Sequence, residues 1–193
     1  MEQKIEFAQN VVLIDAAYMN KVVADMRSHF SQVLNRDLPK ADLACLLECI
    51  GLDAGLRGSD NAVQVIFIYD AQHTVMSDCV PGNLEKELNN VAFKGNLGEF
   101  SLYAFQPAIM ATNEDLFIES LQLVGECKDT KRIVAIPDES SYASAIASYI
   151  KEMKGKEGVT VFGMNPPSGE AVYEFQMLGF AILQALGIRP DEL

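Results

Sequence analysis

The chain has 193 residues, of which 49% are hydrophobic and 22% charged, and this balance predicts one compact domain over residues 1–193. The formal net charge of -12 disfavours RNA, although RNA remains a possible partner, and it gives no attraction to anionic membranes. The opening MEQKIEFAQN lacks the apolar core of a signal peptide, and the most apolar late segment is shorter than a span of about 20 residues. We therefore expect a cytoplasmic protein without membrane contact.

The first predicted element is a buried strand over residues 11–15, which ends in Asp15. The next residues have helical periodicity, with one apolar face made of Met19, Val22, Val23, Met26 and Phe30. A second helix is expected to start near Pro39 and to end at Gly51 or soon after. Residues 63–70 are almost continuously apolar, which is typical of a strand covered on both faces.

The rest of the chain continues to alternate. Strands are expected at 99–107, 132–137 and 158–164, and helices at 82–95, 113–127, 138–153 and 170–187. The helix at 82–95 is expected to be short and irregular, Asn113 is a plausible cap, and Gly187 and Pro190 end the last helix. This alternation predicts a three-layer α/β/α sandwich with a mostly parallel, five-stranded sheet of Rossmann-like build.

Carboxylates follow three of the predicted strands, namely Asp15, Asp70, and Asp138 with Glu139. In parallel sheets ligands bind beyond the carboxyl ends of the strands, so this placement favours a site there. Aspartate at a strand-to-helix turn is equally a common helix cap, and both interpretations stay open for each residue.

Several catalytic motifs are absent from the sequence. It contains no dinucleotide-binding glycine motif, no phosphate-binding loop and no nucleophile elbow, and its two histidines are isolated. Its four cysteines are best explained as free thiols. Clustered carboxylates remain, and these prefer Mg²⁺ or Mn²⁺ as the ion that relieves their repulsion. Such an ion can activate water against a phosphodiester.

The order of elements resembles the NYN branch of PIN-like ribonuclease domains. That family opens with a strand ending in a motif close to IDGxN, and this chain has LIDAAYMN, which puts Asp15 at the first acidic position. Its fourth strand ends in a turn similar to SGDSDF, and here AIPDESSYASAI puts Glu139 on the first acid of that turn. The same spacing puts Glu114 on an acid that precedes the strand. The resemblance implies that Asp15, Glu114 and Glu139 are catalytic residues that hold Mg²⁺ or Mn²⁺, with Asp70, Asp115, Asp138 and Ser141 as neighbouring candidates.

The sequence also departs from the family pattern. Ser141 replaces the second acid of the turn, Ser120 replaces a further helical acid, and Tyr18 stands where the first motif has a small polar residue. A tyrosine there would fill space next to a metal-bound substrate, and loss of a carboxylate weakens metal binding. These departures favour a degenerate site.

Three functions follow from these observations. The first is a non-catalytic binding or scaffold protein with a degenerate acidic site, in which the apolar final helix lies in the core or forms a homodimer. The second is a ribonuclease dependent on Mg²⁺ or Mn²⁺. The third is a small-anion-binding α/β protein that uses the hydroxyls of Ser140, Ser141 and Ser144, although Ser140 or Ser141 could instead cap the next helix.

Overall fold

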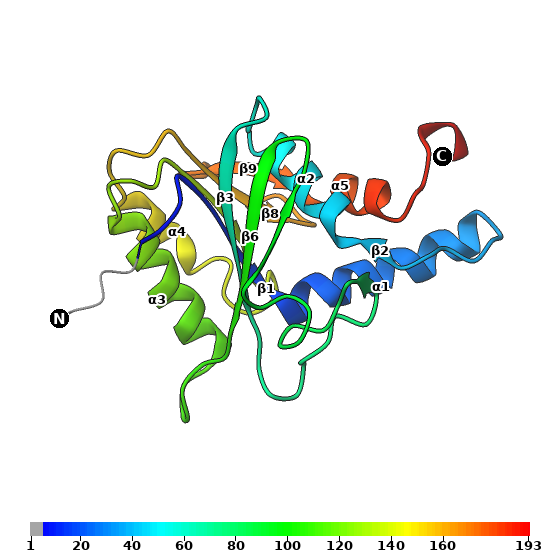
Figure 1. Cartoon of the computed structure of the whole chain (residues 1–193), viewed down its shortest axis with the longest axis horizontal. Helices are drawn as coiled ribbons and strands as arrows, with labels where there is room; N and C mark the ends of the chain where they lie inside the picture. Colours follow the sequence, from blue (N-terminus) through cyan, green and yellow to red (C-terminus); the bar gives the residue numbers. More distant parts are fainter. Residues whose placement is uncertain (1–5) are drawn as a thin grey trace.

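A computed structural model of the chain describes residues 6–193. Within these residues one seven-stranded sheet lies between two layers of helices (Figure 1). The prediction of an α/β fold with a mostly parallel sheet is confirmed. The prediction of five strands is wrong, because two further strands pair at the two edges of the sheet. The expectation of no signal peptide rests partly on residues 1–5, which lie outside the described residues.

The strands of the large sheet are β1 (Asn10–Asp15), β3 (Asn61–Ile68), β5 (Val91–Lys94), β6 (Gly98–Phe105), β7 (Arg132–Ile136), β8 (Gly158–Gly163) and β9 (Glu174–Met177). Two short strands, β2 (Ala41–Asp42) and β4 (Cys79–Val80), pair with each other. The helices are α1 (Ala16–Val33), α2 (Leu43–Asp53), α3 (Asn113–Glu126), α4 (Ile146–Lys151) and α5 (Leu178–Ala185), followed by the 3-10 turn η1 (Pro190–Glu192).

The strand order is β5-β6-β3-β1-β7-β8-β9, and β5 pairs antiparallel to β6 while the neighbouring pairs from β6 to β9 are parallel. The chain therefore winds outward from β1 through β3 to β6, and then crosses back to continue from β7 in the opposite direction. The winding reverses between β1 and β7. In doubly wound sheets this reversal opens the crevice in which ligands bind.

Side chains on the two faces of β1 pack into two separate hydrophobic cores. Val12 and Ile14 pack into the core that includes residues of α1, α2 and α5, whereas Val11 and Leu13 pack into the core that includes residues of α3 and α4. Figure 1 shows α3 and α4 on one side of the sheet and α1, α2 and α5 on the other. Burial of successive residues on opposite faces explains why β1 and β3 are nearly all apolar.

Residues 82–95 do not form the predicted helix. They form turns and then β5, whose Ala92 and Phe93 pair with Ser101 and Phe100 of β6. Asn90 takes a left-handed conformation with φ of 57°, which ends any helix and starts the strand. The second helix also starts later than Pro39, because Asp42 caps α2 through its bond from the Cys45 amide (3.1 Å).

The last predicted helix is also wrong in its first half. Residues 174–177 form β9, which pairs with β8, and only residues 178–185 form α5. A short apolar run has no periodicity that separates strand from helix, and the free edge of β8 decides the outcome here. The expectation that the apolar helix belongs to the core is confirmed, since Leu178, Ala181 and Ile182 are buried. Gly187 follows α5 with φ of 72°, as predicted for a helix end.

In residues 6–193 we find no helix with the length and apolarity that a membrane crossing requires.

Candidate functional site at the strand ends

The structure brings three of the predicted acidic residues to the point where the winding of the sheet reverses. Asp15 is the last residue of β1, and Asp138 and Glu139 follow β7, its parallel neighbour. Side-chain hydrogen bonds join the end of β1 and the start of α1 to the loop after β7. The placement of Asp15, Asp138 and Glu139 at one edge of the sheet therefore follows the sequence prediction.

Two tyrosines, one from α1 and one from the loop after β7, bind the two carboxylates reciprocally. Tyr18, from the start of α1, donates its hydroxyl to Glu139 Oε2 at 2.6 Å. Tyr142, from the loop after β7, donates its hydroxyl to Asp15 Oδ2 at 2.6 Å. Burial raises the pKa of both phenols above the ordinary value, so both stay protonated as donors. We call these four residues the tyrosine–carboxylate bridge.

Asp15 is a helix cap as well as a member of this bridge. Its Oδ1 accepts the Tyr18 amide at 3.1 Å, which satisfies one of the free amides at the start of α1. Its side chain is buried, with only 3% of the residue exposed. Burial raises the pKa of Asp15, the hydrogen bonds from Tyr142 and Tyr18 oppose this rise, and the nearby negative charge of Asp138 adds to it.

The pKa of Glu139 is shifted in the opposite direction to that of Asp15. Its Oε2 also accepts the Met164 amide at 2.8 Å, and its Oε1 accepts the Asn165 amide at 2.7 Å. Desolvation acts to raise the pKa of Glu139, but the hydrogen bonds from Tyr18, Met164 and Asn165 outweigh it and lower the pKa. Glu139 is therefore an anion at neutral pH that fixes the loop after β8.

The remaining candidates in these loops shape turns. Asp138 Oδ1 accepts the Ser140 amide (3.0 Å) and hydroxyl (2.8 Å), while Ser141 is exposed in the same turn. These local bonds compete with helix formation, so α4 starts at Ile146 and the predicted helix over 138–153 is too long at both ends. Neither serine caps α4, whose N-cap is Ala145 without a side-chain bond.

Asp70, after β3, also accepts bonds from its own turn. Its Oδ1 accepts the amides of Gln72 (2.8 Å) and His73 (3.0 Å), and His73 Nδ1 lies 2.8 Å from it. Desolvation acts to raise the pKa of Asp70, but the contacts with His73 and Gln72 outweigh it and lower the pKa. The side chain of Asn113, at the start of α3, donates its Nδ2 to Asp70 Oδ2 at 3.3 Å and so joins α3 to the turn after β3.

A crevice of about 320 Å³ is lined by Tyr18, Lys21, His73, Asp138 and Ser140 among others.

The predicted residues on α3 serve the start of that helix. Thr112, and not Asn113, is the N-cap, and Asp115 completes a reciprocal capping box with it. Glu114 is exposed in the first turn. Among residues 6–193, no group of three or more His, Cys, Asp or Glu side chains is arranged to hold a metal ion, so Asp15, Glu114 and Glu139 do not form one. The oxygens of Asp15 and Glu139 are directed at tyrosines and amides instead.

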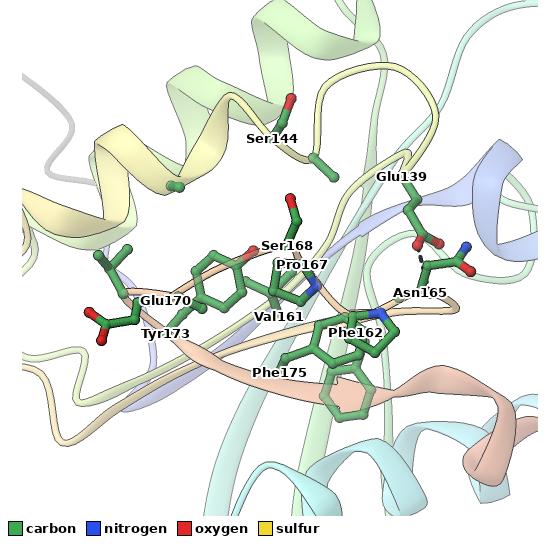
Figure 2. Close-up of a pocket in the computed structure, with 16 residues that line it drawn as sticks. Glu139, Ser144, Val161, Phe162, Asn165, Pro167, Ser168, Glu170, Tyr173 and Phe175 are labelled. Atoms are coloured by element: carbon green, nitrogen blue, oxygen red, sulfur yellow. Dashed lines mark hydrogen bonds between the residues drawn. The ribbon is translucent and has the colours of Figure 1, made fainter.

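A second cavity, of about 370 Å³, lies on the other side of Glu139. Figure 2 shows it between the loop that precedes α4, which carries Ser144, and the segment after β8, which carries Tyr173 and Phe175. The dashed line in Figure 2 marks the bond that ties Asn165 to Glu139. The sequence did not indicate this cavity, because residues 170–177 were assigned to a helix. The local indication of it in the sequence is the pair of aromatic residues Tyr173 and Phe175, two positions apart, both of which line the cavity.

The chain was compared with known proteins. A model of a family described as "Family of unknown function (DUF6621)" matches residues 4–193, and the chain therefore belongs to this family. No curated protein and no solved structure matched it.

Proposed function

We propose that this member of the DUF6621 family is a non-catalytic binding protein whose strand-end carboxylates join loops instead of ligating a metal ion. On this proposal the resemblance to the NYN branch of PIN-like domains is that of a divergent, degenerate member. Asp15 and Glu139 stand at the two strand ends that the resemblance requires, but both carry structural hydrogen bonds.

The observation that carries the proposal is the tyrosine–carboxylate bridge. A metal ion in this crevice would have to compete with the existing hydrogen-bond donors for the lone pairs of the carboxylate oxygens. Asp15 uses one oxygen for the Tyr18 amide and the other for the Tyr142 hydroxyl, and each oxygen of Glu139 accepts at least one donor. A substrate phosphodiester would also have to displace Tyr18, whose hydroxyl reaches from α1 to Glu139 in the loop after β7.

A titration with MnCl₂ followed by thermal melting tests the proposal. We expect no rise in the melting temperature of the wild type, whereas an ion at about 100 times its Kd would add roughly 2.7 kcal/mol of stability. Asp15→Asn should melt a few degrees higher than the wild type. Because the pKa of Asp15 is raised, its charged form begins to cost stability above the ordinary pKa of 3.8, and the cost is complete above the folded-state pKa. Asparagine keeps the cap through its oxygen, and its amide can donate to the Tyr142 oxygen without a charge.

The matched control is Asp60→Asn, which removes one exposed charge just before β3 and should leave the melting temperature nearly unchanged. Cleavage of single-stranded RNA with Mn²⁺ is measured on the same proteins. If the wild type cleaves RNA and Asp15→Asn does not, the protein is the metal-dependent ribonuclease of the second hypothesis and the present proposal is wrong.

A further inference from the structure

The cavity beside Glu139 has features that the tyrosine–carboxylate bridge does not use. We call it the β8–β9 pocket and define it by Glu139, Ser144, Gly163, Glu170, Tyr173 and Phe175. Its volume of about 370 Å³ is within the range of small-molecule sites, which starts at about 300 Å³. It lies beyond the carboxyl end of β8, where open α/β sheets hold their ligands.

The charged side chains that line this pocket are all negative. Glu139 and Glu170 line it, and none of the described residues that line it is basic. Figure 2 shows the two carboxylates at opposite ends of the labelled group, with the ring of Tyr173 between them. The pocket therefore repels anions, and this argues against the small-anion hypothesis at this position.

The walls of the pocket are largely apolar and aromatic. Tyr173 and Phe175 are half-buried, and they line the cavity together with Val161 and Pro167. Gly163 brings two of the walls together, since a Cβ at this position would lie 3.2 Å from the Phe175 ring and 3.4 Å from the Glu139 carboxylate. The Phe175 ring and the Glu139 carboxylate are thus close together at the end of β8, and the Tyr173 ring that lines the same cavity offers a π face to a positive group.

We propose that the β8–β9 pocket binds an organic amine, that is, a primary ammonium group on an aromatic or aliphatic body. The ammonium lies against the Tyr173 face within the field of Glu170 and Glu139, and the body fills the apolar part of the cavity. This inference rests on the proposed function, because it assigns a ligand class to a non-catalytic binding protein.

Isothermal titration calorimetry with three probes of similar shape tests the proposal on the full chain. The probes are 2-phenylethylamine, 2-phenylethanol and 3-phenylpropionate, which are cationic, neutral and anionic at neutral pH. We expect the amine to bind about tenfold more tightly than the alcohol, and the acid to show no heat of binding. Binding of the acid or alcohol as tightly as the amine, or no binding of the amine, overturns the proposal.

Variants locate the binding site. Tyr173→Leu keeps an apolar wall but removes the π face, so it should weaken amine binding about fivefold. Tyr173→Phe keeps the π face, so it should bind the amine about as tightly as the wild type. Glu170→Gln should weaken amine binding about threefold and leave the alcohol unchanged, because this carboxylate is exposed and partly screened. Glu99→Gln on β6 is the matched control, since it removes an equal charge at a distant strand.

The outcomes are separate from those of the metal and RNA tests. Amine binding that none of the pocket variants changes would place the ligand elsewhere and overturn the assignment. Failure of the amine to bind, with no Mn²⁺ response and no RNA cleavage, would remove the amine proposal and leave the non-catalytic proposal intact.

Discussion

Glu139 stands where a catalytic acid is expected, and it makes contacts that stabilise the fold. It follows a central parallel strand, where ligand-binding acids are expected. Its oxygens accept one hydroxyl and two backbone amides from segments that are distant in the sequence. These contacts fix the loop after β8, which forms part of the β8–β9 pocket. Sequence reasoning found the position of Glu139 but not its partners, because the partners depend on how the two loops meet.

Glu139→Gln should destabilise the fold in a pH-dependent way. The pKa of Glu139 is lowered below its ordinary value of 4.5, so its contribution is fully present above pH 4.5 and is lost as pH falls through the folded-state pKa. At neutral pH we expect a loss of about 2 kcal/mol, because two charge-assisted amide bonds are weakened. Urea unfolding between about pH 3 and pH 7 measures the difference from the wild type, which should shrink toward the acid end.

The control for this measurement is Glu119→Gln, an exposed position on α3 that should show a small and nearly constant difference. A Glu139→Gln deficit that is the same at both ends of the pH range would show that the carboxylate charge is not what stabilises the loop.

At the scale of elements, acidic residues of this chain serve as helix caps. Asp15 caps α1, Asp42 caps α2, and Asp115 supports the Thr112 cap of α3. An acid at a helix start satisfies free amides and interacts favourably with the helix dipole, whether or not it also binds a ligand. The sequence alone could not separate the two roles at Asp15, since capping and ligation use the same residue type at the same place.

Thr112→Ala should therefore destabilise the protein, whereas Glu114→Gln should not. Loss of the capping box should cost about 1 kcal/mol and lower the melting temperature by roughly 2–4 °C. Glu114 is exposed and has only the helix dipole as a partner, so its change should stay within about 0.5 kcal/mol. Differential scanning fluorimetry compares the two variants. A larger loss for Glu114→Gln than for Thr112→Ala would contradict this assignment.

The errors in predicted elements have a common cause. Residues 91–94 and 174–177 form edge strands, and their backbone bonds come from β6 and β8. Edge pairing is decided by the partner strand, so a short apolar segment carries little local signal for it. In contrast, the central strands and α1 have long apolar patterns that are buried on a defined face, and their prediction is confirmed.

At the scale of the whole molecule, the net charge of -12 sets the electrostatics. Like charges repel within a compact chain, and salt screens this repulsion over a Debye length of about 10 Å at 0.1 M. We expect the melting temperature at pH 7 to rise by a few degrees between about 20 and 200 mM NaCl. Near pH 5 the rise should be smaller, because part of the carboxylates is protonated there. An equal rise at both pH values would show that salt acts by another mechanism.

The oligomeric state stays a prediction. In α5 the residues Leu178, Ala181 and Ile182 pack in the core, while Phe180 is 67% exposed. The apolar character of this segment is thus mostly explained within one chain.

The sequence by itself determined the α/β class, the central parallel strands and the acidic residues at their ends. These features are local, because hydrophobic periodicity and strand-ending carboxylates can be identified within short windows. Only the tertiary structure decided which donors the carboxylates of Asp15 and Glu139 bind. Tyr18 and Glu139 are 121 residues apart, and Tyr142 and Asp15 are 127 apart. Contacts over such separations are set by strand order and loop packing, which bring the two tyrosine hydroxyls to the carboxylates of Asp15 and Glu139.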